Sequence, residues 1–398
     1  MKLHSKAVHA GDRKKLGDYV PVTTPIYGAA SFIYDEVAEL DRVFGNEKEG
    51  QSYSRYGNPT VDALEQQVAA LEGADVALAA SSGMAAIHLS LLAALTDRRK
   101  SIVAANVLYG QTISLLMNVL EPSGVEVRFA DPCDLDAFEA AVADAKPSCV
   151  LIETVSNPMM RVPALDKVAE IAHRHNAVLV ADSTFTTPVL MRPLGLGADI
   201  VVHSATKYLS GHGDALGGIL VAGEPFRQTL QVLGRTLGMN LGPFEAYLIM
   251  RGVKTLPLRV ERQCQNGAIV AAWLKAHPRI ESTHFPGDPE HPDREIARRL
   301  FERGEGGEEL YGGMVSFEVA GAGKADVFAL MDRLKLVVCA TSLGDVHSMM
   351  LHPAMSSHRD LAPKQRQRMG IGDNLLRLSL GIEAPEDVIA DLEQALGG

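Results

Sequence analysis

Short apolar segments alternate with amphipathic ones between Val76 and Gly223. The apolar segments are continuous runs of Val, Ile, Leu and Ala, which is the pattern of strands buried on both faces of a sheet. Amphipathic helices between such strands are typical of a largely parallel sheet. We therefore predict an α/β protein with one seven-stranded, mainly parallel sheet flanked by helices. Its expected strands are VALAAS, SIVAANV, EVRFAD, SCVLIETV, AVLVADS, DIVVHS and GGILVAG.

The helix before the first of these strands has the clearest periodicity. Val61, Leu64, Val68 and Leu71 follow one another at steps of three or four residues, and Gly73 marks the end of the helix. Before Val61 the chain is irregular and rich in turn formers, as in VPVTTPIYG and GQSYSRYGNPT. This composition predicts an extended N-terminal arm, of the kind that often reaches a neighbouring subunit.

The pattern changes after about Met250. Long helical stretches are followed by two alternating, strand-like segments, MVSFEVAG and LLRLSLGIE, and by a terminal helix from Pro385. This order favours a second, smaller α+β domain. We expect an N-terminal arm over residues 1–58 that contributes to the neighbouring subunit, a sheet domain over 59–250 and a C-terminal α+β domain over 251–398.

Composition limits the partners of the chain. Its 398 residues are 46% hydrophobic and 22% charged, as in a globular protein with a large core. The net charge of −11 leaves no general basic surface for nucleic acid, and the apolar runs are shorter than the ~18 residues of a membrane span. We therefore expect a small-molecule partner, without nucleic acid or membrane. The four scattered cysteines and the polar start MKLHSKAVHAGDRKK predict a cytoplasmic protein without a metal site.

Polar residues close several of the predicted strands, at the sheet edge where open parallel sheets bind ligands. AVLVADS ends at Asp182, DIVVHS ends at Ser204, and Thr206 and Lys207 follow. The segment SSGM leads from a strand into a helix, whose start can bind an anion through backbone N–H groups. An anion cradle, a buried acid and a lysine together meet the needs of pyridoxal phosphate, because the lysine forms the Schiff base and the acid pairs with the pyridine nitrogen.

Each of these features alone has a simpler interpretation. Lys207 fits a surface lysine, and Asp182 fits a helix N-cap before STFTTP. SSGM fits a tight strand-to-helix turn, while His203 and His212 fit hydrogen-bonded structural roles. The occurrence of three polar ends on one predicted sheet favours the cofactor site.

Over nearly its whole length the chain resembles the pyridoxal-phosphate enzymes of cysteine and methionine metabolism. This family includes cystathionine γ-synthase, cystathionine and methionine γ-lyases and O-acylhomoserine sulfhydrylases. The resemblance implies the fold of PLP-dependent transferases of fold type I, a PLP-binding domain over 59–250, and a homotetramer of two dimers that share active sites. It rests on YSRYGNPT, SSGMAAIH, LYGQT, ETVSNP, ADSTFTTP, ADIVVHSATKYLSGHGD, MRGVKTLPLRVERQ, SLGD, HPAMSSH and LLRLSLGIE.

The resemblance also implies roles for individual residues. Lys207 would form the Schiff base, Asp182 would pair with the pyridine nitrogen, and Tyr109 would stack on the ring and assist the leaving group. Asn157 would contact the ring hydroxyl. The implied phosphate contacts come from Gly83, Met84, Ser204 and Thr206 of the same chain and from Tyr53 and Arg55 of a neighbouring chain. The implied contacts to the substrate carboxylate come from Arg377 and the Ser342 backbone.

The activity implied by this resemblance is γ-elimination from a methionine-, homocysteine- or cystathionine-like substrate, giving 2-oxobutanoate, ammonia and a thiol. The alternative is a γ-replacement transferase, either a cystathionine γ-synthase or an O-acylhomoserine sulfhydrylase. Gln111 follows LYG where methionine γ-lyases typically have cysteine, and Thr341 precedes SLG where enzymes handling cystathionine usually have glutamate. A non-catalytic PLP-binding protein is disfavoured because every implied catalytic residue is present.

Overall fold

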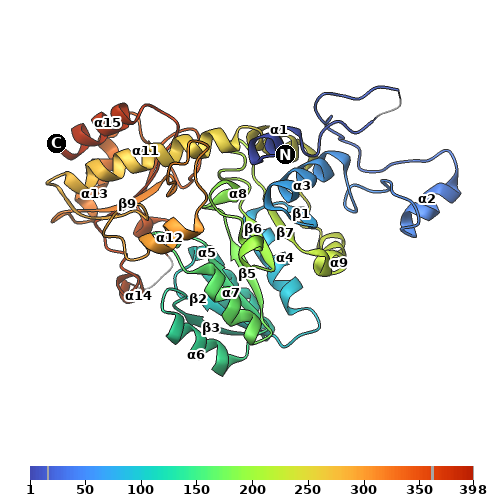
Figure 1. The fold of residues 1–398 in the computed structure, drawn as a ribbon, viewed down its shortest axis with the longest axis horizontal. Helices are drawn as coiled ribbons and strands as arrows, with labels where there is room; N and C mark the ends of the chain where they lie inside the picture. The colour runs from blue at the N-terminus through green and yellow to red at the C-terminus, as the bar shows by residue number, and fades with distance from the viewer. Residues whose placement is uncertain (16–17, 360–362, 398) are drawn as a thin grey trace.

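A large sheet forms the centre of the computed structural model, which describes residues 1–15, 18–359 and 363–397 (Figure 1). Adjacent strands of this sheet are parallel, except that β7 runs antiparallel to both β1 and β6. The predicted seven-stranded, mainly parallel sheet is therefore confirmed. In spatial order its strands are β1 (Val76–Ala80), β7 (Gly218–Ala222), β6 (Ile200–His203), β5 (Val178–Asp182), β4 (Cys149–Glu153), β2 (Ser101–Ala105) and β3 (Glu126–Ala130).

Helices pack against this sheet and bury its central strands. Strands β2, β4, β6 and β7 are buried along their whole length, whereas the edge strand β3 is partly exposed. This burial explains why the strand segments read as continuous apolar runs. The helices of this part are α3 (Pro59–Glu72), α4 (Gly83–Leu95), α5 (Gly110–Leu115), α6 (Leu135–Ala145), α7 (Leu165–Arg174), α8 (Thr187–Leu190), α9 (Arg227–Leu237) and α10 (Pro243–Val253).

Helix α3 shows how local sequence sets the bounds of an element. The Asn58 side chain caps its start by accepting the Thr60 N–H, and Pro59 occupies the first turn. Gly73 ends the helix in the left-handed conformation, with a φ of 73° that favours glycine. The predicted apolar positions Leu64 and Leu71 are buried, as the periodicity requires.

The sequence predicted an irregular N-terminal segment. The structure differs in part, because this segment contains helices α1 (Leu3–His9) and α2 (Val37–Phe44). Helix α1 packs against α3 and α11, while α2 lies on a projection away from the body of the molecule (Figure 1). Helix α1 buries only Ala7, and α2 only Val43. Helices of 7 and 8 residues span about two turns, which is too short for a periodic pattern to be recognised in the sequence.

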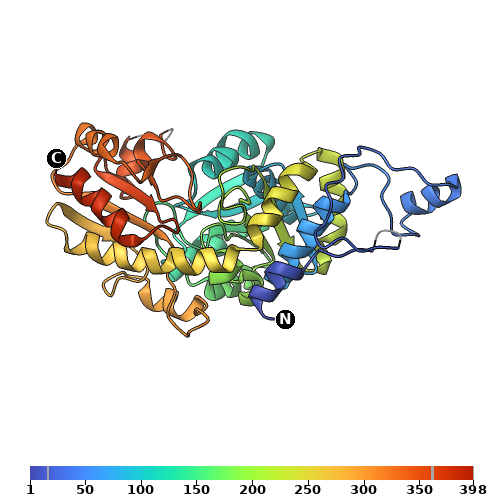
Figure 2. The same ribbon diagram turned by 90° about the horizontal axis from the view of Figure 1, so that it is seen from above.

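A second sheet, with its own hydrophobic core, forms the C-terminal part. Helix α11 runs lengthwise between the two parts of the molecule (Figure 2). The expected smaller α+β unit is confirmed, although the sequence indicated only two of its strands. In spatial order the strands are β10 (Val338–Cys339), β11 (Met349–Leu351), β12 (Leu375–Ser379), β9 (Met314–Val319) and β8 (Ile280–His284). The helices are α11 (Leu256–Ala276), α12 (Arg294–Leu300), α13 (Lys324–Arg333), α14 (Pro363–Arg368) and α15 (Pro385–Gly397).

Within the described ranges, none of the helices combines the length and the apolar content that a membrane span requires.

Candidate active site

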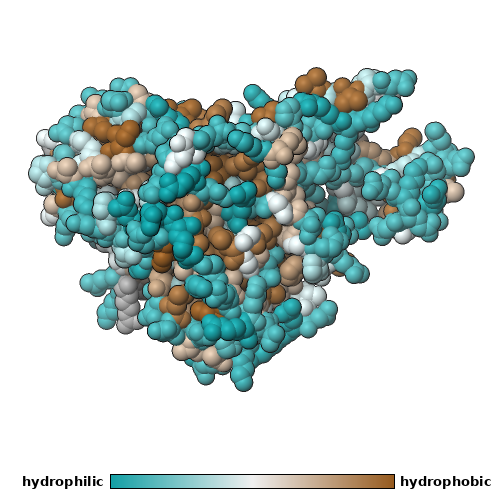
Figure 3. Space-filling view, in the orientation of Figure 1, coloured by the Kyte–Doolittle hydropathy of each residue, from teal (hydrophilic) through white to brown (hydrophobic). Residues whose placement is uncertain are grey.

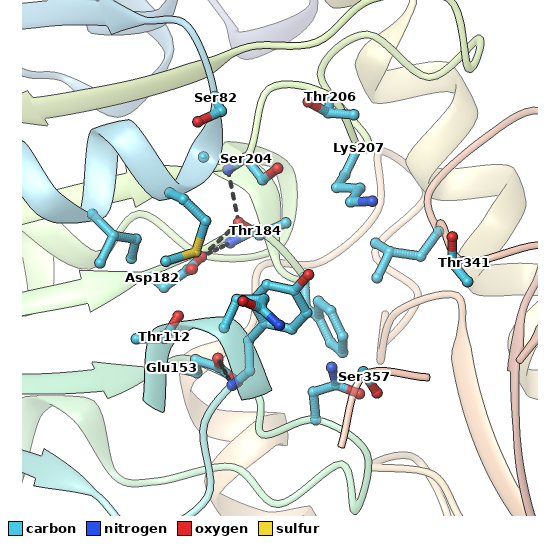
Figure 4. Close-up of a pocket in the computed structure, with 18 of the residues that line it drawn as sticks. Ser82, Thr112, Glu153, Asp182, Thr184, Ser204, Thr206, Lys207, Thr341 and Ser357 are labelled. Atoms are coloured by element: carbon cyan, nitrogen blue, oxygen red, sulfur yellow. Dashed lines mark hydrogen bonds between the residues drawn. The ribbon is translucent and has the colours of Figure 1, made fainter. Parts of the chain in front are cut away.

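A cavity of about 430 Å³ lies beyond the carboxyl ends of β4, β5 and β6 (Figure 4). Glu153 ends β4, Asp182 ends β5, and Ser204 directly follows β6, and all three line the cavity. The C-terminal part closes it with residues that include Thr341 and Arg377. The two polar strand ends noted in the sequence, Asp182 and Ser204, therefore meet in one place, as expected for an open parallel sheet.

Most of the site residues expected from the sequence line this cavity. Ser342 is not a lining residue, but its Oγ accepts a hydrogen bond from Lys207 Nζ at 3.1 Å. Tyr53 and Arg55 lie outside the cavity of their own chain. The expected residues that do line it are Gly83, Met84, Tyr109, Asn157, Asp182, Ser204, Thr206, Lys207 and Arg377.

Asp182 lines the cavity and is held by Thr184 (Figure 4). Its Oδ1 accepts hydrogen bonds from the Thr184 N–H at 2.9 Å and from the Thr184 hydroxyl at 2.5 Å. Thr184 Oγ1 in turn accepts the Ser204 N–H at 2.9 Å. Burial raises the pKa of Asp182, and no Lys, Arg or His side chain of the described chain forms an ion pair with it. A buried acid without a counter-charge fits a cationic ligand group, such as a protonated pyridine nitrogen.

The start of helix α4 forms a concave surface beside Ser204. Ser82 caps the helix by accepting the Ala85 N–H at 3.1 Å, and the helix begins at Gly83. A Cβ on Gly83 would lie 2.8 Å from both Cβ and Oγ of Ser204, so only glycine fits there. The N-terminal N–H groups of this 13-residue helix and the Ser204 side chain therefore border one space. This arrangement fits a phosphate group.

Lys207 projects into the cavity from the loop after β6 (Figure 4). Burial, and secondarily the positive charge of Arg377, lower the pKa of Lys207 to about 8. A much larger fraction of this amine than of an ordinary lysine is therefore unprotonated near neutral pH, and the unprotonated form is the one that attacks a carbonyl group.

Arg377, on β12, places a buried guanidinium in the same cavity. Its Nη1 donates to Asn157 Oδ1 at 2.8 Å and its Nη2 to the Ser342 carbonyl at 3.3 Å. Burial lowers the pKa of Arg377 to about 10, so the group stays positive at neutral pH. Among the described residues its Nε has no hydrogen-bond partner, and no carboxylate forms an ion pair with it. Such a group fits the carboxylate of a substrate.

Comparison with known proteins identifies the family. The family model described as "Cys/Met metabolism PLP-dependent enzyme" matches residues 4–397. The chain belongs to this family. It is 40% identical over 397 residues to an L-methionine gamma-lyase of Fusobacterium nucleatum subsp. polymorphum, covering 99% of this chain and 98% of that protein. It is 38% identical over 394 residues to an O-succinylhomoserine sulfhydrylase of Pseudomonas aeruginosa, covering 98% and 94% of the two chains.

Solved structures agree with this assignment. The cystathionine gamma synthase of Xanthomonas oryzae pv. oryzae, in complex with cystathionine, is 37% identical and superposes with a TM-score of 0.91, covering 100% of this chain and 98% of that chain. A putative O-acetylhomoserine (thiol)-lyase of Campylobacter jejuni contains N'-pyridoxyl-lysine-5'-monophosphate. It is 28% identical, with a TM-score of 0.91 and complete coverage of both chains. This chain thus has the PLP-dependent transferase fold of type I and uses pyridoxal 5'-phosphate.

The sequence interpretation missed two residues of this site. Glu153 ends β4 as Asp182 ends the neighbouring strand, and the two are paired in register. The rule that singled out Asp182 would have found Glu153 in SCVLIETV, had it been applied to that strand. Thr184 had no comparable signal, because a threonine in the turn STFTTP is ordinary.

A metal site was not expected from the sequence. In the part of the chain that the structure describes, no group of three or more His, Cys, Asp or Glu side chains is placed to hold a metal ion.

Proposed function

We propose that this enzyme catalyses γ-elimination from a sulfur-containing amino acid of the methionine, homocysteine or cystathionine type. With one water consumed, the products would be 2-oxobutanoate, ammonia and a thiol. The observation that carries the proposal is the meeting of Lys207, Asp182 and Arg377 in one cavity, because an α-amino acid offers an amine and a carboxylate to such a site. The 40% identity to a methionine gamma-lyase supports the elimination branch.

When bound, pyridoxal phosphate supplies the electron sink that weakens the bonds at the substrate Cα. Lys207 Nζ, with its pKa lowered to about 8, would take the Cα proton. Asp182 would stay ionised beside the pyridine nitrogen, and Asn157, held by Arg377, would orient the ring hydroxyl. The Tyr109 hydroxyl, at the edge of the cavity, would donate a proton to the departing sulfur.

We propose further that Arg377 and the Ser342 backbone bind the substrate carboxylate. Arg377 Nη2 already contacts the Ser342 carbonyl at 3.3 Å, so the two residues lie on the same side of the cavity. The guanidinium Nε is buried and has no hydrogen-bond partner among the described residues. The phosphate would be bound within the chain by Gly83, Met84, Ser204 and Thr206.

A second copy of the chain would complete the phosphate site with its Tyr53 and Arg55. Of the described residues that line the cavity, only Lys207 and Arg377 are cationic, and both have other tasks, so the phosphate needs a positive charge from elsewhere. The arm that carries Tyr53 projects from the body and has exposed hydrophobic patches (Figure 3). Ile33 and Val37 on this arm are 95% and 82% exposed. We propose a homotetramer built from two dimers that share active sites in this way.

A substrate panel tests the reaction. Purified enzyme is given methionine, homocysteine, cystathionine and O-acylhomoserines, each with and without an added thiol, and oxo acid and thioether are quantified. The proposal predicts 2-oxobutanoate and ammonia from a sulfur amino acid without added thiol. A lack of 2-oxobutanoate from every sulfur amino acid, with the cofactor bound, would contradict it.

The second candidate is γ-replacement, in which a thiol adds to a substrate derived from an O-acylhomoserine. Gln111, Thr341 and Leu343 line the cavity, and none of them is charged. These side chains therefore do not select one distal substrate group or one thiol nucleophile over another. The 38% identity to an O-succinylhomoserine sulfhydrylase supports this candidate. In the same panel, thiol-dependent consumption of an O-acylhomoserine with thioether product and little 2-oxobutanoate would favour replacement.

A further inference from the structure

Glu153 is a buried carboxyl group for which the proposed reaction provides no role. It lines the cavity at the end of β4, and it is only 9% exposed. Its Oε1 accepts the backbone N–H of Tyr109 at 2.6 Å (Figure 4). Tyr109 directly precedes helix α5, so this hydrogen bond ties the start of that helix to the end of β4.

Glu153 also lies beside Asp182, because the two residues are register partners on adjacent parallel strands. Register partners on neighbouring strands have adjacent side chains, and two buried carboxylates that lie close together repel each other. Burial and the proximity of Asp182 raise the pKa of Glu153 to about 8, although the backbone N–H groups of Tyr109 and Asn157 and the charge of Arg377 oppose this shift. With a pKa of about 8, Glu153 is mostly protonated at neutral pH.

We propose that Glu153 is a positioning residue for pyridoxal phosphate. Its neutral carboxyl group holds the Tyr109 backbone so that the tyrosine ring lies against the cofactor. A neutral Glu153 adds no negative charge beside Asp182, the acid proposed to pair with the pyridine nitrogen. The inference rests on the roles proposed above for Tyr109 and Asp182. It does not depend on which substrate the enzyme uses.

A matched pair of substitutions separates the hydrogen bond from the charge. Glu153→Gln keeps a side-chain oxygen that can accept the Tyr109 N–H, and it is neutral at every pH. Glu153→Ala removes the acceptor. If Glu153 acts as a neutral acceptor, Glu153→Gln should resemble the unmodified enzyme, and Glu153→Ala should bind the cofactor about tenfold more weakly, as expected for the loss of one buried hydrogen bond.

Glu65 provides the control. It is also a glutamate whose Oε1 accepts a backbone N–H, that of Ala79 at 2.8 Å, and burial raises its pKa to about 8 as well. It does not line the cavity. Glu65→Ala should therefore lower stability, and neither Glu65→Ala nor Glu65→Gln should change cofactor binding.

The experiment measures cofactor binding without substrate, so its outcome is independent of the proposed reaction. Full-chain enzyme stripped of cofactor is titrated with pyridoxal phosphate, and both the dissociation constant and the visible circular dichroism of the bound cofactor are recorded. In Glu153→Ala the dichroism per bound cofactor should fall, because the ring loses its fixed partner. Combining Glu153→Ala with Tyr109→Ala should add nothing to the effect of Tyr109→Ala alone.

Three results would overturn the inference: normal cofactor binding and dichroism in Glu153→Ala, a Glu153→Gln enzyme as impaired as Glu153→Ala, or additive effects with Tyr109→Ala. If Glu153→Ala does not fold, Glu153→Asp replaces it, because its shorter side chain draws the carboxyl away from the Tyr109 N–H. The corresponding control is Glu65→Asp. Equal behaviour of the two aspartate variants would also overturn the inference.

Discussion

Burial changes the chemistry of Lys207 and Arg377, two cations that share one cavity. Burial lowers the pKa of both groups, to about 8 for Lys207 and about 10 for Arg377, and the positive charge of Arg377 contributes to the shift of Lys207. Lys207 becomes a partly neutral amine, whereas Arg377 keeps its charge at neutral pH. A lysine can thus serve as nucleophile and base beside an arginine that binds an anion.

The lowered pKa of Lys207 predicts how cofactor uptake depends on pH. The rate at which cofactor-free enzyme takes up pyridoxal phosphate should rise with pH and level off above about 8, because the reactive amine is then unprotonated. An ordinary lysine, with a pKa of about 10.4, would give a rate that still rises there. Stopped-flow absorbance at a series of pH values measures this profile.

The same profile has an internal control. Arg377→Gln removes the positive charge that helps lower the pKa of Lys207, so the inflection should move to higher pH. An inflection that stays in place would show that burial alone sets the pKa of the lysine.

The geometry of Arg377 predicts a defect in substrate binding when its planar fork is lost. Arg377→Lys should raise KM by about 10- to 100-fold, the size expected for losing a hydrogen bond between charged groups, while cofactor absorbance is retained. Arg299→Lys is the control, since Arg299 forms an exposed ion pair with Asp166 far from the cavity residues. A similar KM in both variants would argue against a carboxylate site at Arg377.

Among the helices and strands, the close contact between β7 and the start of α4 determines the shape of the phosphate cradle. A Cβ on Gly218, the first residue of β7, would lie 2.1 Å from the Ser82 carbonyl oxygen. Residue 218 must therefore be a glycine, without a Cβ, for Ser82 to cap α4 and for Gly83 to face Ser204.

Gly218→Ala should displace Ser82 and lower the free energy of unfolding by about 1–3 kcal/mol, the usual cost of overpacking. Cofactor affinity should fall as well, because the cap residue of α4 moves. Gly223→Ala, one residue beyond the end of β7, is the control, since its nearest atom would be 3.6 Å away. Urea denaturation followed by circular dichroism compares the two variants, and equal midpoints would contradict the prediction.

For the molecule as a whole, the proposed sharing of sites predicts complementation between inactive subunits. Subunits with Tyr53→Phe and Arg55→Ala lack the phosphate contacts, and subunits with Lys207→Ala lack the reactive amine. A mixed dimer has one site in which Lys207, Tyr53 and Arg55 are all intact, so mixing should restore part of the activity. No recovery in dimers shown by mass spectrometry to be mixed would contradict shared sites.

Local pattern was sufficient to predict much of this protein. The strands of the large sheet, the helix that ends at Gly73 and the polar strand ends at Asp182 and Ser204 were predicted correctly from residue types and spacing. Each is encoded within a short segment, because side-chain periodicity and strand ends are local properties. The helices α1 and α2 were missed because helices of 7 and 8 residues are too short for a periodic pattern to be recognised.

The sequence by itself thus determined the fold class, the family and the cofactor, since each depends on short motifs and their order along the chain. Only the tertiary structure brought Arg377 of the C-terminal sheet to Asn157, and Glu153 to Asp182 and the Tyr109 backbone. These contacts depend on the order of strands in the sheet and on the docking of the second sheet. Charge states depend on the same arrangement, because burial by distant segments sets the pKa values of Lys207 and Glu153.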